Sequence, residues 1–248
     1  MATNEQNIKI VTYRGLPGIT NEGVYGPVHG TKYGEVVTAG MHGSKLYPLV
    51  DEGTYFLATN PTMGTGIAGI AASTSFDAAE HLLHIRNTST SKRLYLDFID
   101  LVTTAAGTNG TTTGFTMTAD RGVTRYTSGG SSITPVNPNL ASSETAECTL
   151  KFGALVTTAA SADVRPLGDF LVRTVIKVVG DSYRFNFGGT EDSWQCAGAS
   201  LDGTTSAKIT IPCPPVTLGE NDQFLLSDWA ASQTVGSSYQ LRMGFWMR

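Results

Sequence analysis

The chain has 248 residues, of which 40% are hydrophobic, so it is long enough for one large β domain or two small ones. Only 15% of the residues are charged, and the 17 basic residues are spread along a chain with a net charge of -4, which argues against a nucleic-acid binder. No apolar run is long enough to span a bilayer and the polar N-terminal residues do not form a signal peptide, so we expect a protein that is made in the cytosol and binds no membrane.

The first 47 residues differ in composition from the rest. Between Gly15 and Gly43 glycine recurs without the strict repeat of collagen, and Pro17 and Pro27 interrupt regular structure. We expect residues 1–47 to form an extended, glycine-rich N-terminal arm. Residues 48–248 would then form a β-sandwich domain, in which a loop-rich stretch at residues 127–143 allows a break between two sub-domains.

Alternating apolar and polar residues recur after the arm, separated by clusters of Gly, Asn, Ser, Thr and Pro. This pattern predicts an all-β fold, a jelly-roll or a related antiparallel β-sandwich. Asp77 and Glu80 have the spacing of a helix capping box, so we expect one helical turn that leads into a strand at residues 82–86. Further strands are predicted at residues 94–101, where the alternation slips as in a β-bulge, and at residues 115–119 and 148–152.

The clearest predicted hairpin lies at residues 172–187. Its strands would be Val172–Val179 and Tyr183–Phe187, joined by Gly180, Asp181 and Ser182. Later strands are predicted at residues 209–213, ended by a cluster of prolines, at residues 224–226, and at residues 241–247, which are apolar enough to be paired inside a sheet. Residues 103–114 and 127–143 are predicted to be loops.

One glycine motif resembles a nucleotide-binding loop. Gly64, Gly66 and Gly69 have the spacing of the dinucleotide-binding fingerprint. The residues that follow are too few and too rich in β-branched side chains for a crossover helix, and no βαβ alternation follows. We therefore interpret the motif as a chance match and expect no bound cofactor.

Histidines and cysteines give no catalytic or metal-binding pattern. The four histidines lie in the first third of the chain, and His81 and His84 would point to opposite faces of a strand. Three cysteines, Cys148, Cys196 and Cys213, fit neither a disulfide framework nor a Cys-x-x-Cys metal site, so we expect small buried residues on strands. The sequence thus names no catalytic, cofactor-binding or metal-ligating residue.

Acidic pairs and tryptophans leave open whether the protein cleaves or binds a glycan. A glycoside hydrolase needs two carboxylates, and the chain has four neighbouring pairs: Asp51 with Glu52, Asp97 with Asp100, Glu191 with Asp192, and Glu220 with Asp222. Most of them stand beside Gly or Asn, which predicts turns with solvated acids. Trp194, Trp229 and Trp246 are expected in a core or interface rather than as sugar platforms.

Short segments resemble those of phage structural proteins. In the first 87 residues the resemblance rests on Tyr47 and on three segments, Ala39 to Gly43, Gly53 to Asn60 and Leu82 to Asn87. The end of the chain, LGENDQFLLSD followed by a Ser/Gly loop and YQLRMGFWMR, resembles the closing strands of jelly-roll modules in virion decoration and fibre proteins. The resemblance implies a component of a tailed-phage virion and brings no site residue with it.

Low charge fits this resemblance, because the cores of protein interfaces are depleted in charged residues. We expect a non-enzymatic capsid decoration or cement protein, a homotrimer that is assembled in the host cytoplasm and binds the major capsid protein or other virion proteins. The arm of roughly Thr3 to Tyr47 would anchor it by adding a strand to a neighbour.

Three alternatives remain open. The chain would be a tail or fibre protein if its loops and Trp194 bound host glycans. It would be a major coat protein if it formed the shell itself, although it lacks a basic arm for packaged nucleic acid. It would be a glycan depolymerase if Asp97 or Glu191 served catalysis.

Overall fold

The computed structural model describes residues 46–71, 76–108, 111–122, 124–158, 164–188, 195–198 and 205–248, with only the backbone described at 46–48 and 195–198. Contacts divide the chain into a unit of residues 1–47 and a unit of residues 48–248. The predicted arm lies outside the described residues, apart from Leu46 and Tyr47, which belong to helix α1 (Leu46–Asp51) and are therefore not extended.

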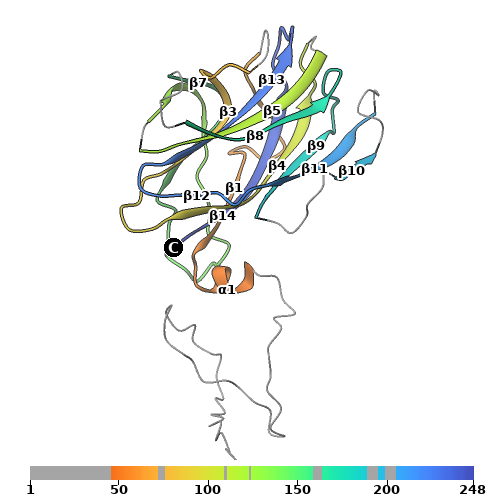
Figure 1. The fold of residues 1–248 in the computed structure, drawn as a ribbon. Helices are drawn as coiled ribbons and strands as arrows, with labels where there is room; N and C mark the ends of the chain where they lie inside the picture. Colours follow the sequence, from red (N-terminus) through yellow and green to blue (C-terminus); the bar gives the residue numbers. More distant parts are fainter. Residues whose placement is uncertain are drawn as a thin grey trace, which may run out of the picture. The chain divides into compact units, whose positions relative to one another are not determined.

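Residues 48–248 form a β-sandwich of two sheets (Figure 1). The first sheet has the order β1 (Tyr55–Thr59), β14 (Ser238–Met247), β4 (Leu94–Ala105), β9 (Ser182–Phe187), β11 (Ala207–Cys213) and β10 (Gln195–Gly198), with β2 (Ile67–Ala68) on β14 and β12 (Thr217–Leu218) on β4. The second sheet has the order β6 (Tyr126–Ser132), β7 (Cys148–Thr157), β3 (Glu80–Asn87), β13 (Gln223–Ala231), β5 (Thr111–Asp120) and β8 (Val164–Arg173). Apart from the parallel pair of β9 with β11, the strand pairs within the described residues are antiparallel. The predicted all-β sandwich is confirmed.

The core lies between the two sheets, where aromatic side chains from both sheets meet. Phe115 on β5 makes edge-to-face contacts with Tyr183 and Phe185 on β9, at 5.0 and 5.4 Å between ring centroids. Phe187 on β9 contacts Phe224 on β13 in the same way, at 5.6 Å. All five rings are buried. Such pairs add about 0.5–1.5 kcal/mol each beyond the area that they bury, so they fix one sheet on the other.

Strand β4 contains the predicted β-bulge. Phe98 lies opposite Gly244 while Leu96 lies opposite the next residue, Phe245, so Asp97 is the extra residue of β4. The bulge changes which alternate residues face the core. Leu96 and Ile99 therefore both lie in the core, and Asp100 is on the outer face of the first sheet.

The predicted hairpin at residues 172–187 is wrong. Val172 and Arg173 end β8 in the second sheet, whereas Tyr183 belongs to β9 in the first sheet. Residues 174–181 cross from one sheet to the other without forming a strand. Within this crossover Lys177 turns inward to a buried carboxylate, as described below.

Two predicted loops are partly strands. Residues 103–105 continue β4 and residues 111–114 begin β5, so only residues 106–110 remain between these strands. Residues 127–132 belong to β6, which pairs with β7. Gly129 and Gly130 have φ values of 87° and 62°, which glycine adopts without strain, and these two glycines let β6 bulge and still pair.

The predicted helical turn before β3 is a hydrogen-bonded turn instead. The backbone N–H of Glu80 donates to the Asp77 carbonyl at 3.2 Å, and the Asp77 side chain accepts from the N–H of Ala79 at 2.8 Å. The strand that follows is confirmed as β3. The other predicted strands are confirmed as β4, β5, β7, β11, β13 and β14, and β14 is paired on both sides.

Candidate functional site

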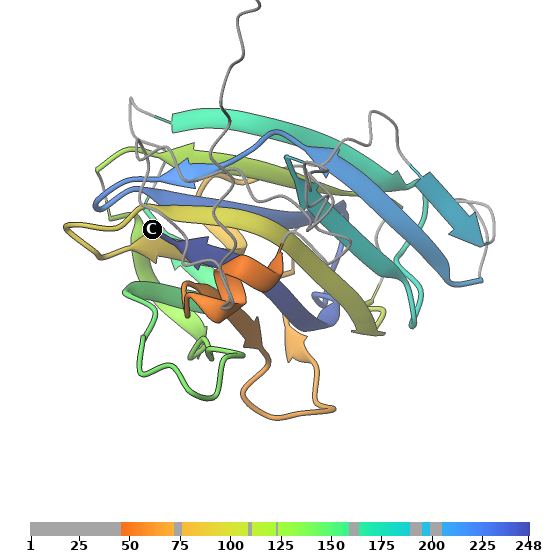
Figure 2. The ribbon, with the colours of Figure 1, turned by 90° about the horizontal axis from the view of Figure 1, so that it is seen from below.

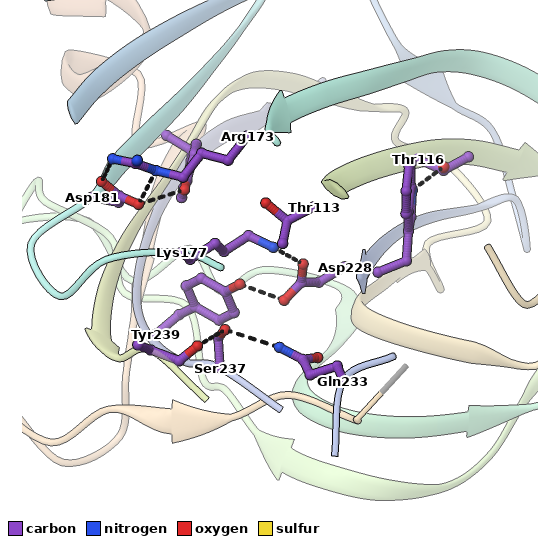
Figure 3. Close-up of polar contacts among 12 residues, drawn as sticks. Thr113, Thr116, Arg173, Lys177, Asp181, Asp228, Gln233, Ser237 and Tyr239 are labelled. Carbon is purple, nitrogen blue, oxygen red and sulfur yellow. Dashed lines mark hydrogen bonds and ion pairs between the residues drawn. The ribbon is translucent and has the colours of Figure 1, made fainter. Parts of the chain in front are cut away.

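The connection from β8 to β9 carries a buried ion pair (Figure 3). Arg173 donates from Nε and Nη2 to the two carboxylate oxygens of Asp181, both at 2.7 Å, and both side chains are 0% exposed. Asp181 also accepts from the N–H groups of Val178 and Ala207 and from the hydroxyl of Tyr183, at 2.8, 2.8 and 2.9 Å. Burial beside this carboxylate raises the pKa of Tyr183 above its usual range. The pair ties the crossover to both sheets.

A second buried group stands next to it. The ammonium of Lys177 donates to one carboxylate oxygen of Asp228 and the hydroxyl of Tyr239 donates to the other (Figure 3). Lys177 Nζ also lies 4.8 Å from the centre of the Phe115 ring. A lysine, an aspartate and a tyrosine are groups that catalyse proton transfer elsewhere. Here they are closed off from solvent and satisfy one another, so they hold the crossover in place.

A third buried pair lies at the end of β5. Arg125 donates from Nη1 to Asp120 at 3.0 Å and from Nε to the carbonyl of Thr158 at 3.1 Å. It also donates to the carbonyl of Ala78. This guanidinium thus connects the turn before β3 with the segment after β7, and its role is to close this end of the second sheet.

His81 and His84 lie on the same face of the second sheet, contrary to the prediction. His81 is hydrogen bonded through Nδ1 to the Ser227 hydroxyl, and His84 Nε2 lies 2.9 Å from the Gln223 side-chain oxygen. Gln223 and Ser227 are four residues apart on β13, so they share a face. The reason is a β-bulge in the pairing of β3 with β7 between His81 and Leu83, which shifts the alternation.

Both histidines are held in the neutral form. Burial, with Arg125 nearby, lowers the pKa of His81 to about 3, and burial also lowers the pKa of His84. Because the Gln223 oxygen can only accept, His84 carries its proton on Nε2. In the part of the chain that the structure describes, no three His, Cys, Asp or Glu side chains are grouped to hold a metal ion.

Among the acidic pairs singled out in the sequence, the residues that the structure describes have separate partners. Asp97 accepts from the Tyr55 hydroxyl at 2.8 Å, whereas Asp100 accepts from Arg242 at 2.6 Å. Asp222 accepts from the N–H groups of Gly219 and Gly122, which agrees with the predicted turn. Asp51 ends α1, and Glu191 and Asp192 lie outside the described residues.

The remaining sequence candidates are structural where they are described. The glycine motif contains β2, and the described residues between it and β3, 70–71 and 76–79, contain no helix. Trp229 donates to the Thr116 hydroxyl at 2.9 Å and Trp246 stacks on Tyr95 at 5.4 Å, while Trp194 lies outside the described residues.

The cysteines lie on strands, as predicted. Cys148, Cys196 and Cys213 are on β7, β10 and β11, and the side chain of Cys196 is not among those described. Cys148 and Cys213 are free thiols, and burial raises the pKa of each to about 12. Neither is therefore a ready nucleophile at neutral pH, because the thiolate is the reactive form.

A surface loop, residues 133–147, holds the start of the β domain. Asn137 donates from its side chain to the Gly53 carbonyl at 2.7 Å, and Asn139 donates to the Asp51 carbonyl at 3.1 Å. Val136 and Leu57 exchange two backbone hydrogen bonds of 2.7 and 2.9 Å. Figure 2 shows this loop in green beside the orange α1. The residues that directly follow the predicted arm are thus fastened to the sandwich.

The same loop presents apolar side chains to solvent. Leu140 is 97% exposed and Val136 is 58% exposed. The sequence predicts residues 127–143 as a loop, of a kind that is usually functional or interface-forming, but does not indicate which side chains it exposes. The available signal is a valine and a leucine among turn-forming residues, where Asn137 and Asn139 accept Asx-type hydrogen bonds from the backbone N–H groups of Asn139 and Ala141. We call the surface formed by Val136 and Leu140 beside Asp51–Gly53 the arm-root surface.

No protein family, curated protein or solved structure matches the chain. Among the described residues, no helix is long and apolar enough to cross a membrane. The β-sandwich by itself assigns no function, because such folds serve many unrelated ones.

Proposed function

We propose that the chain is a non-enzymatic virion protein, a capsid decoration or cement protein that binds the major capsid protein. The arm of residues 1–47 would reach onto the shell, and the arm-root surface would pack against it. The observation that supports this best is the exposure of Val136 and Leu140 on a loop that is hydrogen bonded to Asp51 and Gly53. A force that pulls on the arm would be transmitted to the sandwich through these hydrogen bonds.

Charge and composition support the same proposal. Only 15% of the chain is charged, and three of the seven ion pairs among the described residues are buried inside the fold. A surface of this kind loses little solvation free energy when it is covered, which suits a protein that coats other proteins. The proposed assembly is a homotrimer, formed without nucleic acid and without a membrane.

The test is re-attachment of the purified chain to virus particles from which it has been stripped. We expect Val136→Asp and Leu140→Asp to weaken attachment by about tenfold or more, because a charge at the core of an interface must be desolvated. Val179→Asp is the matched control, since Val179 is 57% exposed on the crossover between β8 and β9. Sedimentation of particles with bound protein measures the effect.

Further measurements separate the parts of the proposal. Removal of residues 1–45 should abolish attachment while the thermal unfolding of the sandwich stays cooperative. The mass in solution should be three times the 26.3 kDa of one chain. Particles that carry the chain in the tail, or that bind the truncated protein as tightly as the full chain, would contradict the decoration role.

A further inference from the structure

A groove crosses the outer face of the first sheet, and it is formed by other residues than the arm-root surface. Its volume is about 480 Å³, within the range of ligand sites. Two neighbouring rows of side chains line it, each with one residue from β11, β9, β4 and β14. The first row is Thr210, Arg184, Asp100 and Arg242, and the second row is Lys208, Ser182, Val102 and Gln240.

The strand registers explain why the surface is hollow there. In the second row the two middle positions carry the short side chains of Ser182 and Val102, while Lys208 and Gln240 stand at the ends. Neighbouring strands are about 4.8 Å apart, so the row extends for about 14 Å across the sheet. A linear ligand would lie along this row, with the longer side chains of the first row as a wall.

The wall of the groove holds two arginines in fixed positions. Arg242 donates from Nη2 and Nε to one oxygen of Asp100 at 2.6 and 3.1 Å, and Arg184 donates to the same oxygen at 3.3 Å. Arg184 also donates to Asn186 at 2.8 Å. Both guanidinium groups lie over the Phe98 ring, at 4.7 and 5.4 Å from its centre. Their orientation is therefore set before any ligand arrives, which lowers the entropy cost of binding.

Positive charge is in excess in the groove. Among the described residues that line it, Asp100 is the one carboxylate, against Arg184, Arg242 and Lys208. Within the described part of the chain, the exposed Lys208 has neither an ion pair nor a hydrogen bond through its ammonium group. An anionic group at the Lys208 end of the hollow would gain this ammonium as a charge-assisted donor.

We propose that this groove binds an acidic glycan, with a sugar carboxylate at Lys208. Hydroxyl and amide groups of Ser182, Thr210 and Gln240 can both donate and accept, as sugar hydroxyls do. An acidic peptide fits less well, because β4 and β9 are paired on both sides and leave no sheet edge for an added strand. Of the apolar residues along the groove that the structure describes, Ile209 and Leu241 are buried in the core, which leaves Val102 to anchor a peptide.

The test is calorimetric titration of the full chain with oligomers of galacturonate, alginate, hyaluronate and polysialic acid. We expect at least one of them to bind. The methyl ester of that oligomer should bind at least about tenfold more weakly, because it lacks the negative charge. Lys208→Gln should weaken binding by about tenfold. Ser182→Tyr should abolish it by filling the hollow at unchanged charge.

The matched control is Arg165→Gln, which removes one exposed positive charge from β8 in the other sheet. Binding of this variant should match the unaltered chain within about twofold, and thermal unfolding should show that every variant is folded. The proposal is overturned if none of the four oligomers binds, if the ester binds equally well, or if Lys208→Gln and Arg165→Gln have equal effects. Tighter, Lys208-dependent binding of poly-glutamate would assign the groove to an acidic peptide instead.

Discussion

The inside of the sandwich and the outer face of its first sheet use the same kind of ion pair in different surroundings. Asp181 pairs with Arg173 where both side chains are 0% exposed. Asp100 pairs with Arg184 and Arg242, which are 41% and 60% exposed. A buried charge that loses its partner costs several kcal/mol, whereas an exposed pair contributes little. Charged groups thus stabilise the fold inside the sandwich, whereas those on the outer face of the first sheet remain available to a ligand.

The largest effect is expected from breaking the buried pair. Asp181→Asn keeps the size of the side chain but leaves the Arg173 guanidinium buried without a counter-charge. We expect the free energy of unfolding to fall by about 3–5 kcal/mol. Urea unfolding followed by circular dichroism measures this. A loss below about 1 kcal/mol would show that the crossover from β8 to β9 does not depend on the pair.

The next largest effect is expected from acid, through the two buried histidines. An unfolded histidine has a pKa near 6.5, and burial lowers the pKa of His81 to about 3. The unfolded chain therefore binds protons more readily than the folded chain. For His81 this contribution to stability is complete above pH 6.5 and is lost as the pH falls from 6.5 toward 3, by about 1.4 kcal/mol per pH unit. The lowered pKa of His84 acts in the same direction.

The histidine effect can be isolated with one variant. His81→Gln removes the titrating ring, so its free energy of unfolding should fall less steeply between pH 6.5 and 4.5 than that of the unaltered chain. The difference in slope should approach one proton, or about 1.4 kcal/mol per pH unit. Equal slopes in the two proteins would mean that His81 is protonated in the folded state.

The strands were predictable because their residues face the core on one side and solvent on the other. Tyr183, Phe185 and Phe187 are buried and alternate with half-buried polar residues on β9, as the apolar and polar residues of the sequence do. The slip after Phe98 was also readable, because a bulge moves the apolar positions by one. Local pattern was sufficient wherever a strand had one buried face.

Features that depend on distant partners were not predictable. Lys177 looks like the polar position of a strand, and only Asp228, 51 residues further on, draws it inward. The bulge that brings His81 and His84 to one face is set by β7, far along the chain. The groove on the first sheet likewise arises from the register of four strands, and no segment of the sequence contains more than a part of it.

The smallest effect is expected from the exposed pair, and it completes the comparison with Asp181. Asp100→Asn removes the carboxylate that Arg184 and Arg242 share. Because water can solvate both guanidinium groups, we expect the free energy of unfolding to change by about 1 kcal/mol or less. Salt should reduce even this difference, since exposed charges are screened. If the free energy of unfolding fell as much as in Asp181→Asn, the ion pairs of the outer face would stabilise the fold as strongly as those of the core. The groove would then serve the stability of the sheet instead of being a surface left for a ligand.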